Sequence, residues 1–599
     1  MLGLKKRFEL LPSSCVSVLS FVLMCCSWLQ VSAATISLKG EVLDTDGKPV
    51  SHARVTFYPL PQSINMVATT VFSNATGKFI FPAALVTNAT DDFSVMVNAL
   101  NYDQLSLAKG KLSVTEHAQN PESGVIELTV VMQHQANQAL AAPASAWLKD
   151  VPNTDAKGKL LVDCVNCHQF PSPEVHNFIH SLNSIGGAES EQIRKQAWHE
   201  KIDHMSAIFA DALARGRAGN ESAETVTAPA SQEFFNHQDA DEIIELLITQ
   251  LSGGSEVLEG YEYGAPLAVT EKTVIREYQL QRPNAIREAI SLGTPPQLWV
   301  ADFYGDRVVR VDVASGAQKE FAVPFDRASG PHTLVRGKDD SLWLSGVFNS
   351  FIGQLDPISE KWRIWSLKTQ PPVSPHDLTY NFRNELAMDT QGRIWFSDIA
   401  NNALGSFNPA TGAELSFPAS VKAGRKPGEM SMYGIVMTSD QHHICYTQLG
   451  GDFGCFNTET LGYETTLALP IGAGPRRMAI TENDIIYIPL FGAGQLVEYD
   501  ARTKTKTATY DLPDRASGPY AATWDVKRRV VWIATSNADV IYRFDPEKKI
   551  FGVIPLPRQK AYLRMLAVDP NSGQLVTSYA NLPEPVNGPR MAVMIDPGN

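Results

Sequence analysis

The chain has 599 residues, 44% of them hydrophobic and 19% charged, so it is too long for a single hydrophobic core and too apolar to be mainly disordered. Its formal net charge is −13 at pH 7. Because nucleic-acid binding needs clustered lysine and arginine to neutralise phosphates, this charge argues against a nucleic-acid partner.

The N-terminal segment has the pattern of a secretory signal. Lys5-Lys6-Arg7 precedes an apolar run that extends through Met24, and Val31-Ser32-Ala33-Ala34 follows it. Residues 1–33 are therefore expected to be removed on export to the bacterial periplasm or the medium. A membrane anchor is the alternative, although the run is shorter than the ~20 residues that span a bilayer. We expect no membrane span after signal removal, since no later segment is long and apolar enough.

Residues 36–133 alternate apolar and polar side chains between short turn signals, which predicts a small β-sandwich. The strings Gly40-Glu41-Val42, Ala53-Arg54-Val55 and Thr76-Gly77-Lys78-Phe79 resemble the carboxypeptidase regulatory-like domain. The resemblance implies a transthyretin-like accessory module without chemistry of its own.

Residues 145–254 change to helical periodicity and contain Cys164-Val165-Asn166-Cys167-His168, the attachment signature of c-type haem. Two thiols at this spacing form thioethers to the porphyrin vinyl groups, and the adjoining histidine supplies a ligand to the iron. We predict one covalent haem c on Cys164 and Cys167, with His168 as axial ligand. Zinc binding or a dithiol redox pair is the alternative, but a zinc site normally needs a second pair of ligands.

The sixth iron ligand follows from a resemblance. The segment Trp198 to Met205 resembles mono-haem class I-like cytochromes c, in which a tryptophan precedes the axial methionine, and the apolar helix from Asp239 resembles their terminal helix. The resemblance covers residues 145–254 and implies a small α-helical cytochrome c domain with Met205 bound to iron. His204 is the alternative ligand. A thioether ligand would raise the reduction potential relative to a second histidine.

Residues 270–599 repeat with the period of propeller blades, and core strands such as Leu298-Trp299-Val300 and Ile394-Trp395-Phe396 recur seven times. This predicts a seven-bladed β-propeller, with six or eight blades as alternatives. The segment Thr273 to Leu280 would be the outer strand of the last blade and would close the ring.

Four strings at the blade starts resemble the virginiamycin B lyase (streptogramin lyase) family: Gly330-Pro331-His332, Pro375-His376, Gly474-Pro475-Arg476 and Gly518-Pro519-Tyr520. The resemblance implies that His332 and His376, with Asp398 as carboxylate, would hold Mg²⁺ and abstract a proton. The chain departs from the family where Gly330 and Ser374 replace an acidic residue, and where Arg476, Tyr520 and Arg564 replace histidine.

These residues still favour a polar, cationic channel pocket, including Arg476 and Tyr520, for an anionic or hydroxylated small molecule. The alternative is that Gly-Pro only sets the turn into each inner strand. Separately, Cys445 and Cys455 flank a turn at Leu449-Gly450-Gly451-Asp452, which predicts a cross-strand disulfide in an exported protein; two buried thiols are the alternative.

Our leading hypothesis is a periplasmic c-type cytochrome whose haem transfers electrons, with a propeller that binds a small substrate or a redox partner protein. A dehydrogenase is one form of this hypothesis, but the sequence has no separate quinone or flavin signature, so whether the protein is an enzyme stays open. The alternatives are a metal-dependent lyase or lactonase on the propeller, and a non-catalytic binding or sensing protein.

Overall fold

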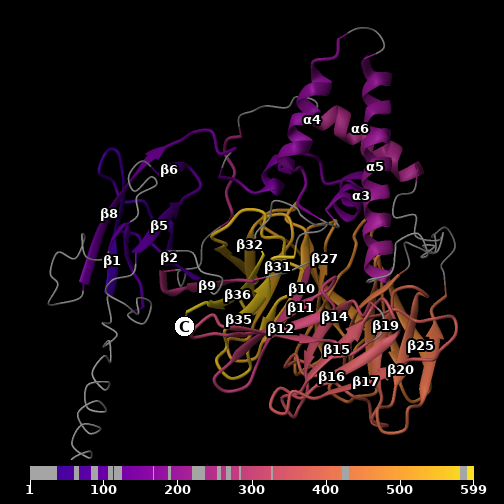
Figure 1. Cartoon of the computed structure of the whole chain (residues 1–599). Helices are drawn as coiled ribbons and strands as arrows, with labels where there is room; N and C mark the ends of the chain where they lie inside the picture. Colours follow the sequence, from indigo (N-terminus) through magenta and orange to yellow (C-terminus); the bar gives the residue numbers. More distant parts are fainter. Residues whose placement is uncertain are drawn as a thin grey trace, which may run out of the picture.

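The computed structural model describes residues 37–59, 66–82, 92–104, 112–113, 125–139, 141–165, 168–186, 190–218, 237–251, 258–264, 271–281, 285–325, 328–420, 431–580 and 590–598. In these ranges the chain is mainly β, with a group of α-helices standing on one end of a propeller and a smaller set of strands at its side (Figure 1). The expected signal, residues 1–33, lies outside the described ranges, as does Cys167. No helix in the described ranges is long and apolar enough to span a bilayer.

The N-terminal strands form two facing sheets. One has the order β4 (Lys78–Ile80), β1 (Ser37–Asp44), β8 (Val125–His134), β6 (Tyr102–Gln104); the other contains β3 (Val67–Phe72), β2 (Arg54–Pro59), β5 (Asp92–Asn98) and β7 (Leu112–Ser113). Alternate residues of both sheets, such as Val42, Phe57 and Phe93, form one buried core. The alternation of apolar and polar residues produces this two-layer arrangement because successive side chains of a strand point to opposite faces.

The helical part contains η2 (Ala144–Leu148), α3 (Asp155–Cys164), α4 (Pro173–Asn183), α5 (Ser190–Ala218) and α6 (His237–Gln250). Thr154 caps α3, since its side chain accepts a hydrogen bond from the Lys157 amide. Both α3 and α5 pack against α6, whose apolar stripe Ile243, Ile244 and Leu247 is buried as its periodicity predicts.

Six four-stranded antiparallel sheets, and four strands of a larger antiparallel sheet, make up the remaining described residues. Their strands in chain order are β10 (Ile286–Leu292), β11 (Gln297–Asp302), β12 (Arg307–Asp312), β13 (Gln318–Ala322); β14 (Pro331–Arg336), β15 (Leu342–Gly346), β16 (Phe351–Leu355), β17 (Trp362–Ser366); β18 (Pro375–Leu378), β19 (Ile394–Asp398), β20 (Ala403–Phe407), β21 (Glu414–Pro418); β22 (Met432–Met437), β23 (His443–Gln448), β24 (Asp452–Asn457), β25 (Gly462–Ala468); β26 (Ala479–Ile480), β27 (Ile485–Leu490), β28 (Gln495–Asp500), β29 (Thr505–Asp511); β30 (Pro519–Asp525), β31 (Val530–Thr535), β32 (Val540–Asp545), β33 (Ile550–Pro555); and β34 (Ala567–Val568), β35 (Leu575–Ser578), β36 (Met591–Asp596) with β9 (Val274–Gln279).

These sheets form a closed ring. The first strand of each sheet contacts the first strand of the next, and β35 of the last sheet contacts β10 of the first. The last sheet is completed by β9, which pairs with β36 in antiparallel register, so the two ends of the propeller sequence meet in one blade. The seven repeats and the closing role expected for residues 273–280 are therefore both present in the topology.

A further pairing attaches the N-terminal strands to the propeller. The free side of β9 pairs with β3, with Thr69 opposite Arg276, so the last blade continues into an eight-stranded sheet. Next to this junction the buried Arg54 donates from Nη1 to the Leu556 carbonyl at 2.8 Å. The sequence repeats did not predict this continuous sheet, which covers an edge that would otherwise be open to solvent.

Candidate functional site at the channel mouth

Each blade contributes one side chain at or just before the start of its inner strand, and together these side chains line the central channel. We call this set the channel ring; its members are Arg287, His332, His376, Tyr433, Arg476, Tyr520 and Arg564, and each is at most 8% exposed. Neighbours are in contact: the rings of His332 and His376 are 4.2 Å apart, as are those of His376 and Tyr433. Arg476 lies 5.2 Å from the Tyr433 ring centroid.

The turns before the inner strands explain this common position. Gly330, Gly474 and Gly518 have φ values of 55°, 57° and 61°, a left-handed conformation that favours glycine. The proline that follows each of them has a restricted φ and begins the strand in the same direction. Turn chemistry therefore positions His332, Arg476 and Tyr520, the three members of the channel ring that follow a glycine-proline step.

The channel ring carries three arginines and no carboxylate. Arg476 lies against the aromatic rings of Tyr433, Phe491 and Tyr520, and its Nε and Nη1 have no hydrogen-bond partner among the described residues. Arg287 lies 4.4 Å from the Phe303 centroid. Burial, together with the nearby charge of Arg564, lowers the pKa of Arg287 to about 10.

Two tyrosines on opposite sides of Arg476 share a hydrogen bond between their hydroxyl groups, Tyr433 Oη and Tyr520 Oη. Burial raises the pKa of Tyr433. Burial also opposes ionisation of Tyr520, but the charges of Arg564 and Arg476 outweigh it, so the pKa of Tyr520 is lowered. Arg564 Nη1 donates to Tyr520 Oη at 3.1 Å. Of the two phenols, Tyr520 is the one suited to accept or hold negative charge.

The two histidines expected to act in catalysis lie side by side in the channel ring. Burial and the surrounding positive charges lower the pKa of both His332 and His376 well below 6.5, so both imidazoles are neutral near pH 7. A carboxylate lies close to one of them: Glu288 Oε1 is 3.7 Å from His332 Nδ1. Glu288 could not be recognised as a site residue from the sequence because it lies within a wholly buried strand that resembles core.

Asp398, the third expected catalytic residue, has a different environment. It is buried at the end of β19, where it accepts hydrogen bonds from the Ser374 amide at 2.9 Å and from Asn401 Nδ2 at 2.6 Å. These contacts hold the turn that leads into His376. In the described part of the chain no three His, Cys, Asp or Glu side chains form a group that could hold a metal ion.

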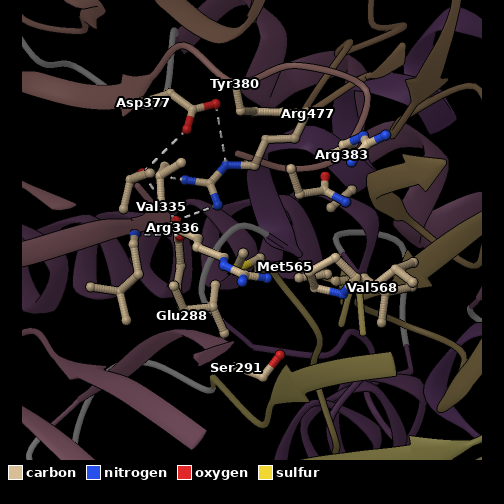
Figure 2. Close-up of a pocket in the computed structure, with 18 of the residues that line it drawn as sticks. Glu288, Ser291, Val335, Arg336, Asp377, Tyr380, Arg383, Arg477, Met565 and Val568 are labelled. Carbon is tan, nitrogen blue, oxygen red and sulfur yellow. Dashed lines mark hydrogen bonds and ion pairs between the residues drawn. The ribbon is translucent and has the colours of Figure 1, made fainter. Parts of the chain in front are cut away.

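A second layer of polar residues lies one residue further along the inner strands. Figure 2 shows Arg477 between two carboxylates: Nη1 forms an ion pair with Glu288, and Nε lies 3.7 Å from Asp377 Oδ2. Nη2 also donates to Thr333 Oγ1 at 2.9 Å. Burial, reinforced by Glu288 and opposed by Arg477, raises the pKa of Asp377 to about 7. A cavity borders this layer and is lined in addition by Arg336 and Arg383.

Val165 inside the Cys-Cys-His motif, and Gln169 and Phe170 just after it, contact the propeller. Helix α3 ends at Cys164, and the carbonyl of the next residue, Val165, accepts a hydrogen bond from Tyr562 Oη. The same hydroxyl receives Arg564 Nη2 at 3.3 Å, so Tyr562 connects the turn with the channel ring. Two further contacts hold the segment after the turn: Phe170 exchanges hydrogen bonds with Asn537, and Gln169 Nε2 donates to Asp539 Oδ1 at 2.6 Å.

Glycines allow α3 to approach this closely. A Cβ on Gly158 of α3 would lie 2.7 Å from the Gly472 carbonyl oxygen, and a Cβ on Gly474 would lie 2.5 Å from Val162 Cγ2. Because Gly474 immediately precedes the Pro475-Arg476 step, the helix that carries Cys164 lies over the part of the ring that contains Arg476.

Two residues of the Cys-Cys-His motif, Cys164 and His168, lie within the described residues. Cys164 is half-buried and not disulfide-bonded within the described residues, and burial raises the pKa of its thiol. His168 Nδ1 lies 2.8 Å from the Gln169 carbonyl. If Nδ1 donates this bond, the lone pair of the imidazole is on Nε2, the arrangement typical of metal-binding histidines. Cys167 lies outside the described residues.

The two candidates for the sixth ligand differ in exposure. Both belong to α5, where Met205 is half-buried and His204 is exposed. Trp198, the tryptophan expected to precede the axial methionine, is 4% exposed and packs edge-to-face on Phe178 with ring centroids 4.9 Å apart. Elsewhere, Cys445 of β23 and Cys455 of β24 are directly opposite in the fourth blade and form a disulfide.

Comparisons with known proteins concern the propeller. A streptogramin B lyase structure aligns with 54% of this chain and 97% of its own, at 17% identity and a TM-score of 0.45. Virginiamycin B lyase from Staphylococcus aureus aligns with 54% and 99% of the two chains, at 14% identity and a TM-score of 0.44. The β-propeller domain of Cps50 (Swd1) from Myceliophteria thermophila aligns with 53% and 99%, at 10% identity and a TM-score of 0.40. No protein-family model and no curated protein matches the sequence.

Proposed function

We propose that this protein is an exported c-type cytochrome with one haem on Cys164, Cys167 and His168, held over one mouth of a seven-bladed propeller. The haem would exchange electrons with a partner protein or with a small molecule bound at the channel ring. The observation that carries the proposal is the contact between the attachment turn and the ring, which runs from the Val165 carbonyl through Tyr562 to Arg564.

The surroundings of the turn support this assignment. The helix that leads into the motif is capped by Thr154, packs on the terminal helix α6 and is paired with it through Lys159 and Glu242 at 2.7 Å. A haem bound here would supply one-electron chemistry. The protein would fix the position of the turn and provide, within the ring, a phenol of lowered pKa at Tyr520 that can accept a proton.

A metal-dependent lyase is the second candidate, favoured by the pair of neutral imidazoles at His332 and His376. Mg²⁺ prefers oxygen ligands and would have to bind beside three buried arginines. The positive charge of the ring opposes a divalent cation and favours an anion. The charge of the ring therefore disfavours the lyase.

Production in a host competent for haem c maturation tests the proposal. The purified wild-type protein should give a pyridine haemochrome spectrum with one covalent haem per chain. Cys164→Ala/Cys167→Ala should be colourless, whereas Cys445→Ser/Cys455→Ser, which removes the same number of cysteines, should keep the haem. Colourless wild-type protein with magnesium-dependent turnover that is lost in His376→Ala would instead establish the lyase.

A further inference from the structure

We propose that the channel ring is a carboxylate-binding site, with Arg476 and Arg287 as the residues that receive the oxyanion. The same chemistry has two possible sources, a propionate group of the haem or a free aromatic carboxylate. The first source rests on the proposed function; the second does not.

Two consecutive arginines, Arg476 and Arg477, have different surroundings. Arg476 and Arg477 are 2% and 5% exposed, so both guanidinium groups are buried. Arg477 has an ion pair with Glu288 and donates to Thr333. Arg476 lies against the rings of Tyr433 and Phe491, and its Nε and Nη1 have no hydrogen-bond partner among the described residues. A buried, unpaired charge is costly, and a planar guanidinium matches a carboxylate with two parallel hydrogen bonds.

Arg287, in another blade of the channel ring, is also a buried arginine with guanidinium nitrogens that have no hydrogen-bond partner among the described residues. These nitrogens are Nε and Nη1; the residue is 7% exposed and faces the Phe303 ring at 4.4 Å. Its pKa is lowered by burial and by Arg564, which means that the ring already contains mutually repelling positive charges. A bound anion would relieve this repulsion.

The neighbours of Arg476 indicate from which side the carboxylate enters. A Cβ on Gly474 would lie 2.5 Å from Val162 of α3 and 3.7 Å from Arg476 Nη1. The guanidinium therefore lies close beneath the helix that ends in Cys164. On its other side the second layer begins, where Arg477, Glu288 and Asp377 already pair with one another. The oxyanion is expected between α3 and the channel ring.

The walls of the site define the class of ligand. Aromatic side chains of Tyr433, Phe491 and Tyr520 surround the guanidinium of Arg476, with centroids 4.8 to 5.7 Å from Cζ. The neighbouring His332 and His376 are neutral, so they add polar contacts without charge. This combination suits a flat, apolar group that ends in a carboxylate, which describes both a haem edge with its propionate and an aromatic acid.

Titration with benzoate, combined with redox potentiometry, tests the site and separates the sources. Benzoate binding is measured calorimetrically on the full chain and on the Cys164→Ala/Cys167→Ala chain, each with and without Arg476→Gln. Arg515→Gln is the matched control, because Arg515 lies near the same end of the propeller and is paired with Asp511 at 2.8 Å, so the same charge is lost outside the ring. A haemochrome assay comes first and reports independently on the proposed function.

Benzoate binding that weakens at least tenfold in Arg476→Gln and is unchanged in Arg515→Gln supports a free carboxylate. A haem midpoint potential that falls in Arg476→Gln but not in Arg515→Gln, with benzoate bound only by the haem-free chain, supports a propionate, since losing a positive charge destabilises the reduced haem. If Arg476→Gln does not fold, Arg287→Gln replaces it. If neither chain binds benzoate and neither arginine substitution changes the potential more than Arg515→Gln does, the proposal is overturned.

Discussion

The hydroxyl of Tyr562, in the last blade, donates a hydrogen bond to the main-chain carbonyl of Val165, inside the Cys-Cys-His motif. The two residues are 397 positions apart in the sequence, and Tyr562 is completely buried at the contact. The same hydroxyl also accepts a hydrogen bond from Arg564 Nη2. A single side chain therefore couples the predicted haem-attachment turn to the channel ring, and changes at one should be measurable at the other.

Tyr562→Phe removes this connection while it keeps the aromatic ring. The Val165 carbonyl loses its donor, and leaving a buried polar group unsatisfied costs about 1–3 kcal/mol. We expect faster hydrogen exchange in the peptide around residues 161–172, measured by mass spectrometry. Tyr510→Phe is the control, because its hydroxyl contacts Glu498 on the outer part of the fifth blade. Equal protection of that peptide in wild type and Tyr562→Phe would contradict the coupling.

Gly158→Ala tests the close approach of α3. In an isolated helix this change would stabilise by about 1 kcal/mol, because alanine has the higher helix propensity. Here the new methyl group would lie 2.7 Å from the Gly472 carbonyl oxygen, so we expect a net loss of stability in thermal denaturation. Gly186→Ala is the control, since a Cβ there meets no atom within 4 Å. A higher melting temperature for Gly158→Ala would show that α3 does not pack on the propeller as described.

The raised pKa of Asp539 predicts how the stability of the fold depends on pH. Burial raises its pKa from 3.8 to about 6, although Gln169 and the Ala561 amide partly oppose the shift. Between these two values the folded protein binds more protons than the unfolded chain, so the free energy of unfolding should fall as pH rises from about 4 to about 6. The contribution is on the order of 3 kcal/mol.

Asp539→Asn, which resembles the protonated acid, should remove this part of the pH dependence. Urea denaturation of both proteins between pH 4 and 6.5 measures the difference. Parallel curves for wild type and variant over that range would mean that Asp539 keeps an ordinary pKa in the fold.

The two consecutive arginines should respond in opposite ways to the same substitution. In the haem-free Cys164→Ala/Cys167→Ala chain, Arg476→Met removes a buried charge whose Nε and Nη1 have no hydrogen-bond partner among the described residues, and it should raise stability by about 1 kcal/mol or more. Arg477→Met leaves Glu288 and Asp377 uncompensated and should lower it by about 3–5 kcal/mol. Chemical denaturation at pH 7 checks both; a loss of stability in Arg476→Met comparable to that in Arg477→Met would argue for an internal partner of Arg476.

Removal of residues 1–134 tests the continuous sheet. The deletion leaves β9 as an edge strand, with the groups that paired with β3 exposed. Open strand edges pair with other chains, so the truncated protein should self-associate in light scattering at concentrations where the full chain does not. A monomeric, equally stable truncation would show that the β3–β9 pairing contributes little.

Much of the propeller could be predicted from the sequence because each blade repeats the same local signals. A buried Trp or Tyr strand recurs in six of the seven blades and a glycine-proline turn begins three of them, and these are properties of neighbouring residues. The same turns identified His332, His376, Arg476 and Tyr520. Arg287 and Tyr433 were missed as ring members because their blades begin with Ala285 and Ser431 in place of Gly-Pro; their equal position in the repeat was the available signal.

Contacts between distant segments could not be predicted in this way. The pairing of β3 with β9 and the bond from Tyr562 to Val165 depend on how separately folded parts meet, and neither leaves a pattern in its own segment. Asp398 illustrates a related limit: the resemblance to the lyase family implies a catalytic carboxylate there, and did not indicate the hydrogen bonds that its oxygens accept from the Ser374 amide and Asn401 Nδ2.

The most direct test of the account is the mass of one tryptic peptide. Cleavage after Lys159 and Arg194 releases residues 160–194, which contain both cysteines of the motif. From protein matured in a host competent for haem c assembly, this peptide should carry one haem through two thioether bonds. The same peptide recovered with two unmodified thiols would contradict the assignment of the turn as a haem-attachment site.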